Sequence, residues 1–121
     1  MPKESIIVTK SYNFALKIVK VVASLPKNSA GQVLGKQLIK SGTSIGANVE
    51  EAQGAASKKD FINKITISNK EARETRYWLK LIRDSKMIKI DQVELLLEDC
   101  DAIINILTAI IKTSKHSMNS K

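Results

Sequence analysis

Apolar and small residues recur at alternating steps of four and three along most of the chain, and this spacing constrains the fold more than any other feature of the sequence. Steps of this kind place successive side chains on one face of an α-helix. The clearest such stripe consists of Phe61, Ile65, Ser68, Ala72, Thr75, Leu79 and Ile82. Alternation with a period of two is scarce, so the chain is expected to be all-α.

Three further stripes of the same kind cover the rest of the chain, over residues 7–25, 34–52 and 93–111. Four long helices joined by short links predict an antiparallel up-down-up-down four-helix bundle. A length of 121 residues is also the usual size of one domain. We therefore expect residues 1–121 to form a single domain.

Capping residues mark the expected helix ends. Ser29, Ser57 and Asp91 are the predicted N-caps, because each is followed three positions later by Gln, Asp or Glu. Gly54 is expected to end the second helix. With these boundaries we predict helices near residues 5–25, 29–53, 57–85 and 91–114, followed by a frayed polar tail over 115–121.

The chain has one cysteine, Cys100, and one histidine, His116, which excludes an intrachain disulfide and argues against a zinc site or a histidine-based triad. Glycine loops that cradle phosphates are absent as well. We expect no enzyme, no cofactor and no metal. Cys100 occupies a core position, where a buried and inert thiol is expected. A lone cysteine and the lack of a bilayer-length apolar run favour a cytoplasmic protein without membrane contact.

The second helix carries a narrow stripe of glycines, formed by Gly31, Gly35, Gly42 and Gly46. Each glycine costs about 1 kcal/mol relative to alanine inside a helix, so a stripe of four requires a reason. One explanation is close contact with a helix of the same bundle. The other is a groove for a neighbouring protomer.

Positive charge is concentrated on two of the predicted helices. The formal net charge is +8, and residues 57–89 contribute ten basic and four acidic side chains. Such a surface is typical of nucleic-acid binding, although a solvated helix face gives the same pattern. The candidate phosphate-contacting residues are Arg73, Arg76, Lys80 and Arg83 on one flank of the third helix, and Lys10, Lys17 and Lys20 on the first.

Apolar residues outside the core stripes indicate a protein–protein interface. Ile67 and Trp78, the only tryptophan, lie on the flank of the third helix that carries Glu71 and Glu74. In the fourth helix, isoleucines widen the apolar face beyond one stripe. The predicted oligomer-interface residues are Ile67, Trp78, Ile106 and Ile110.

Three segments resemble a known family: SIGANVEEA at 44–52, SKKDF at 57–61 and KEARETRYWL at 70–79. They are similar to the four-helix bundle proteins encoded in intervening sequences of bacterial 23S ribosomal RNA genes. The resemblance implies a ring-shaped homopentamer without catalytic residues. Related accessory proteins of diversity-generating retroelements form a basic barrel that binds nucleic acid and a reverse transcriptase.

The leading hypothesis is a non-enzymatic, oligomeric bundle that binds RNA or DNA through its basic surface without strong sequence preference. The main alternative is a protein-interaction scaffold whose basic face docks an acidic partner. A third and more remote alternative is an enzyme with a substrate pocket in the ring. The salt dependence of RNA binding separates the first two, because phosphate contacts weaken steeply as salt rises.

Overall fold

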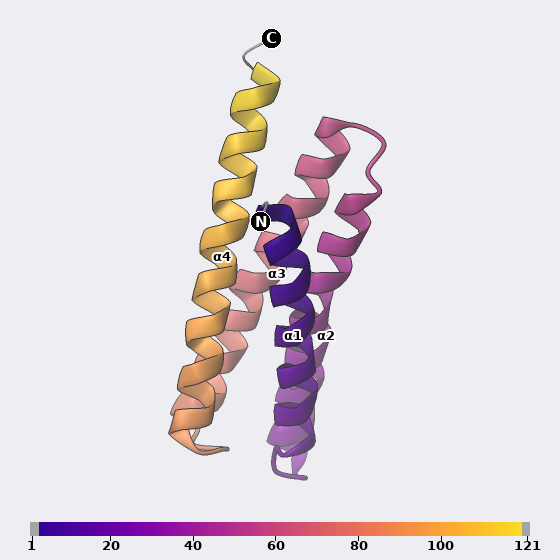
Figure 1. The fold of residues 1–121 in the computed structure, drawn as a ribbon. Helices are drawn as coiled ribbons and strands as arrows, with labels where there is room; N and C mark the ends of the chain where they lie inside the picture. The colour runs from indigo at the N-terminus through magenta and orange to yellow at the C-terminus, as the bar shows by residue number, and fades with distance from the viewer. Residues whose placement is uncertain (1–2, 120–121) are drawn as a thin grey trace.

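The computed structural model describes the backbone of residues 3–119 and the side chains of residues 6–119. It contains four helices in the order α1 (Lys3–Ala23), α2 (Ser29–Gln53), α3 (Lys58–Asp84) and α4 (Ile90–Asn119). The helices run alternately down and up (Figure 1). The predicted all-α, up-down-up-down bundle is confirmed.

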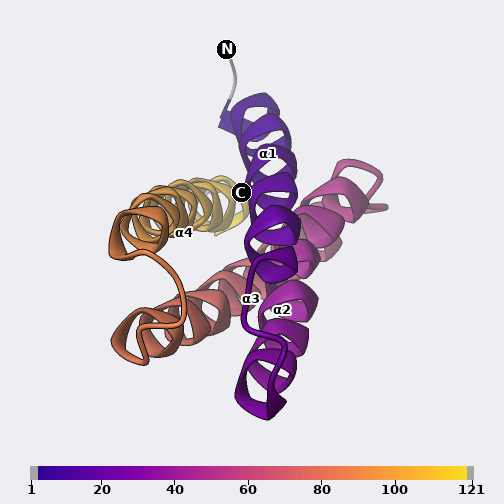
Figure 2. The same cartoon turned by 90° about the horizontal axis from the view of Figure 1, so that it is seen from below.

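Each helix packs against the two helices beside it in the bundle. α1 contacts α2 and α4, and α3 contacts α2 and α4, with no α1–α3 or α2–α4 packing among the described residues (Figure 2). The α1–α4 contact is the least extensive of the four. As a result, the α1/α4 side and the α2/α3 side are opposite sides of the molecule.

The core contains most residues of the stripes that the sequence predicts, together with buried residues beside them such as Ile103 and Ile110. Ile18, Ile45, Leu79 and Leu107, one from each helix, have no exposed surface. Three members of the predicted stripes are only partly buried and pack against the rim of this core: Leu34, Phe61 and Ile111. No helix within residues 3–119 is long and apolar enough to span a membrane.

The helix starts differ in part from the predicted caps. α2 is capped by Asn28 instead of Ser29, because the Asn28 side chain accepts a 2.8 Å hydrogen bond from the amide of Gly31. Ser57 caps α3 as predicted and accepts from the Asp60 amide at 3.1 Å. Asp91 lies inside the first turn of α4. The prediction of Ser29 is therefore wrong by one residue, and asparagine is as strong an N-cap as serine.

The last helix is longer than predicted, and the expected frayed tail is wrong for residues 115–119. α4 stays helical to Asn119, because Ser114 is buried and Lys58 donates a 3.4 Å hydrogen bond to the hydroxyl of Ser117. Residues 120 and 121 lie outside the described part. At the other end of the chain, α1 ends at Ala23, two residues earlier than predicted.

The glycine stripe is buried against α1, so the close contact within the bundle is the correct explanation. A Cβ atom added to Gly42 would lie 3.0 Å from Cγ2 of Ile18, and one added to Gly46 would lie 3.4 Å from the carbonyl oxygen of Ser11. At Gly31 an added Cβ would collide with the carbonyl oxygen of Pro26. The α1–α2 contact therefore depends on missing side chains.

Polar groups hold α3 at a fixed level against its neighbours. The buried hydroxyl of Ser68 donates to the carbonyl of Ile45 at 2.8 Å. The Thr75 and Ser41 hydroxyls are 2.9 Å apart, with Thr75 as the donor. These three hydroxyls each have a hydrogen-bond partner, which removes most of the cost of placing them in the core.

Candidate nucleic-acid interface

The predicted basic stripe of α3 lies on the flank that faces α4, where carboxylates partly neutralise it. Nε of Arg76 lies 3.2 Å from Oδ1 of Asp101, and Nη1 of Arg83 lies 3.5 Å from Oε1 of Glu94. The Arg76 contact is electrostatic, because Nε is not aligned to donate a hydrogen bond. Two of the four predicted residues therefore have acidic partners within the same chain.

Arg83 has a second acidic partner in the neighbouring residue. Its Nε donates a 2.9 Å hydrogen bond to Oδ1 of Asp84, which raises the pKa of Arg83 and lowers the pKa of Asp84. Arg73 and Lys80 are exposed and form no ion pair with any residue in the described part of the chain. Of the predicted α3 stripe, these two retain unpaired charge.

The three lysines predicted on α1 have different surroundings. Nζ of Lys17 forms a 2.9 Å ion pair with Oδ2 of Asp99 on α4. Lys10 is half-buried and Lys20 is exposed. Because α1 and α3 do not contact each other, the structure does not bring these lysines together with the α3 arginines.

The α1–α2 hairpin holds a basic surface that the sequence patterns did not single out. Residues 5–49 contain six lysines and neither aspartate nor glutamate. The net charge of residues 28–56 did not reveal this acid-free run, because Glu50 and Glu51 offset Lys36 and Lys40 in the sum. A search for the longest run without acidic residues would have found it.

Lys27 and Lys36 border a groove at the loop end of this hairpin. The groove has a volume of about 380 Å³, and its walls include Val22, Leu25 and Ile39. Lys40 is exposed one turn further along α2. None of these lysines forms an ion pair within residues 3–119, so their charge is available to a ligand.

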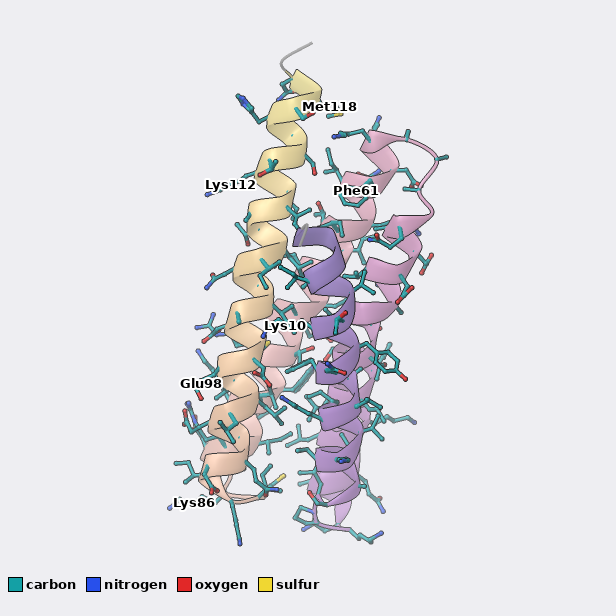
Figure 3. All side chains as sticks on the ribbon, viewed as in Figure 1. Lys10, Phe61, Lys86, Glu98, Lys112 and Met118 are labelled. Atoms are coloured by element: carbon teal, nitrogen blue, oxygen red, sulfur yellow. The ribbon has the colours of Figure 1, made fainter. Side chains whose placement is uncertain are left out.

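α4 has the opposite charge pattern. Residues 90–111 contain five acidic residues and no lysine or arginine. Three of these carboxylates belong to the ion pairs with Lys17, Arg76 and Arg83. α4 thus partly neutralises the flanks of α1 and α3 that face it, whereas Lys27, Lys36 and Lys40 of the α1–α2 hairpin have no ion-pair partner among residues 3–119. Figure 3 shows the side chains of Glu98 and Lys112 extending outward from α4.

The predicted interface residues separate into three environments. Ile67 is exposed. Trp78 is half-buried, and its Nε1 donates a 3.4 Å hydrogen bond to Glu74. Ile106 is half-buried beside a groove between α1 and α4. Ile110 is 2% exposed and belongs to the core, so contacts within its own chain explain its presence. The width of the α4 stripe did not distinguish core from surface isoleucines.

Exposed apolar residues that sequence patterns missed occur on all four helices. The most exposed are Ile90 and Leu95 on α4, Tyr12 on α1, Val33 on α2 and Tyr77 on α3. Tyr12, Leu16 and Val19 follow one another at steps of four and three on the face opposite the α1 core stripe. That second stripe was visible in the sequence.

Cys100 is buried as predicted, with no exposed surface, and its thiol contacts the carbonyl oxygen of Ala72 at 3.2 Å. Burial, with a smaller contribution from Asp101, raises its pKa to about 12. Within residues 3–119 there is no group of three His, Cys, Asp or Glu residues arranged to hold a metal ion.

Comparison with known proteins identifies the family. The family model described as 23S rRNA-intervening sequence protein matches residues 3–109. The chain belongs to this family. A solved structure from Bacteroides thetaiotaomicron VPI-5482, described as a protein of unknown function from the S23 ribosomal protein family, is 42% identical in sequence to this chain. The match has a TM-score of 0.86 and covers 92% of this chain and 99% of that one.

No curated protein matches the sequence. Membership in the 23S rRNA-intervening sequence protein family therefore fixes the fold and the relationship, and the basic surface has to be interpreted from its own geometry. The resemblance found in the 44–52, 57–61 and 70–79 segments is confirmed, since all three lie inside the matched range.

Proposed function

We propose that this member of the 23S rRNA-intervening sequence protein family is a non-enzymatic, cytoplasmic homo-oligomer that binds RNA through the α1–α2 hairpin. The observation that carries the proposal is the run of residues 5–49, with six lysines and no acidic residue. Lysines without carboxylate neighbours attract the phosphate backbone regardless of base sequence.

The proposed phosphate contacts are Lys27, Lys36 and Lys40, which are exposed and unpaired within the described residues. Arg73 and Lys80 supply additional charge on α3. Arg76, Arg83 and Lys17 contribute less, because each would have to leave a carboxylate of its own chain to reach a phosphate. The pentamer that the family resemblance implies would repeat this lysine surface around a ring and strengthen binding through multivalency.

Salt titration of binding to a fluorescently labelled RNA tests this proposal. Replacing Lys27, Lys36 and Lys40 by glutamine should weaken binding about equally for unrelated RNA sequences. It should also reduce the slope of log K against log salt by about 2, as expected for three lost contacts. The matched control replaces Arg76 and Arg83 by glutamine, and its slope should remain close to that of the wild type.

A reversed result, with the slope falling only in the arginine variant, would move the binding surface to α3. Failure of the wild-type protein to bind any RNA at low salt would reject the proposal. It would favour the alternative of a scaffold that docks an acidic protein on the same lysines.

A further inference from the structure

The flank of α3 opposite its α4-facing arginines carries an apolar stripe with an acidic centre. Ile67, Glu71, Glu74, Trp78 and Leu81 follow one another at steps of four and three. The flank of α3 that carries Arg76 and Arg83 forms ion pairs with α4. The flank that carries Ile67 and Trp78 therefore lies on the side of α2. Ile67 is 42% exposed and Leu81 is 37% exposed.

α2 extends this surface with Val33, which is 61% exposed. The Thr75–Ser41 hydrogen bond fixes the antiparallel level of the two helices, so the α3 residues near 78–81 lie level with α2 residues near 35–38, about half a turn from Val33. We call the surface formed by Val33, Ile67, Glu71, Glu74, Trp78 and Leu81 the α2/α3 face.

A second apolar surface lies along the loosest seam of the bundle, between α1 and α4. One groove of about 250 Å³ is lined by Lys17, Lys20, Val21, Gln92, Leu95, Leu96 and Asp99. A second groove of about 320 Å³ is lined by Ile6, Asn105, Ile106 and Ala109. Leu95 is 64% exposed and Ile6 is 40% exposed. We call the residues of these two grooves the α1/α4 face.

The two faces carry opposite charge beside their apolar parts. On the α1/α4 face, Asp99 neutralises Lys17, while Lys20 has no ion-pair partner within residues 3–119. On the α2/α3 face, the exposed Glu74 accepts a hydrogen bond only from Trp78, at 3.4 Å, and forms no ion pair in the described part of the chain. One face therefore has an unpaired cation and the other an unpaired anion.

We propose that the α2/α3 face of one copy docks on the α1/α4 face of a second copy, with Trp78 in the groove beside Leu95 and Glu74 paired with Lys20. This inference rests on the homo-oligomer proposed above and specifies its contact. Tryptophan is the side chain most enriched at the centres of interfaces, and a charge pair at the rim sets the docking orientation. Lys27, Lys36 and Lys40 lie outside this contact and remain free for RNA.

The contact joins two different surfaces on opposite sides of each protomer. Such heterologous contacts leave one face of each kind open in a dimer, and therefore continue until they close into a ring or extend as a filament. A two-fold dimer, in which the same face meets itself, is not expected.

A charge-reversal cycle tests the contact in the full-length protein. Lys20→Glu and Glu74→Lys should each raise the subunit dissociation constant at least about tenfold, measured by light scattering across a dilution series. The double variant should return to within about threefold of the wild type, because the reversed charges attract again. Lys112→Glu, a charge reversal on an exposed part of α4, should leave the mass unchanged. Circular dichroism checks that every variant is folded.

Trp78 is the only tryptophan of the chain, so its fluorescence is a second, independent test of the contact. Its fluorescence should shift to longer wavelength when the wild type dissociates on dilution or when Lys20→Glu breaks the contact. If neither single reversal changes the mass of the oligomer, or if the double variant does not regain wild-type affinity, this contact is overturned. The proposed homo-oligomer itself would still stand. A wild-type monomer overturns both, and the RNA titration still tests the hairpin separately.

Discussion

The α1–α2 hairpin and the α3–α4 hairpin have the same topology but are held together differently. α1 and α2 approach closely because glycines replace side chains along their contact, and residues 5–49 of this pair carry six lysines and no acidic residue. α3 and α4 are joined by ion pairs such as Arg76–Asp101 and by a buried thiol. Two arginines of the second hairpin thus pair with carboxylates across it, whereas Lys27, Lys36 and Lys40 of the first have no ion-pair partner among residues 3–119.

This difference shows why the number of basic residues on a helix is a poor guide to a phosphate-binding surface. α3 carries more basic residues than α1 or α2, yet two of its arginines face carboxylates. The α1–α2 hairpin has fewer cations, but of the six lysines in residues 5–49 only Lys17 forms an ion pair in the described part of the chain. The sign of the neighbouring charges decides which cations a ligand can reach.

The largest expected effect concerns the buried thiol between α3 and α4. A pKa of about 12 against an ordinary value of 9.0 lowers the thiolate fraction of Cys100 about a thousandfold near neutral pH. Alkylation by iodoacetamide at pH 8 should therefore be at least about a thousandfold slower in the folded protein than in guanidinium chloride. Mass spectrometry follows the reaction, and modification of the native protein at the rate of a free thiol would show that the α3–α4 contact is open.

The same thiol should make stability fall at alkaline pH. Since the folded-state pKa is the higher one, the contribution is complete below pH 9 and is lost as the pH rises toward 12. Cys100→Ala should remove that part of the alkaline decline, as measured by urea unfolding at a series of pH values.

A smaller but still large effect is expected on the glycine side of the comparison. Gly31→Ala should lower the free energy of unfolding by about 2–3 kcal/mol, although alanine favours helix, because its Cβ would meet the Pro26 carbonyl. Gly54→Ala is the matched control, since its nearest atom would be 3.9 Å away. Thermal unfolding compares the two, and equal stability of both variants would refute the close approach of Gly31 to the Pro26 loop.

The smallest expected effect is on the ion pairs of the second hairpin. Arg76→Gln should cost less than about 1 kcal/mol of unfolding free energy, because the Arg76–Asp101 pair is partly exposed and screened. Urea unfolding measures the difference. A loss above about 2 kcal/mol would mean that this pair, like the glycine contact, is essential to packing.

Sequence patterns predicted the fold well and the site only in part. The core stripes identified the four helices and the Ser57 cap, because helical periodicity reflects burial directly. They could not separate core Ile110 from half-buried Ile106, since both lie at the edge of a wide stripe. They also could not show that Arg76 and Arg83 face α4 carboxylates, because pairing between helices depends on their relative rotation and level.

The loose seam between α1 and α4 has a consequence for the order of folding. Every other helix contact joins neighbours in the chain, which close short loops and form early. The Lys17–Asp99 pair joins residues 82 positions apart, so this seam requires the whole chain to be in place. We expect the α1–α4 contact to form last during folding and to open first under native conditions. Hydrogen exchange would detect this opening as faster amide exchange in the terminal turns of α1 than in α3.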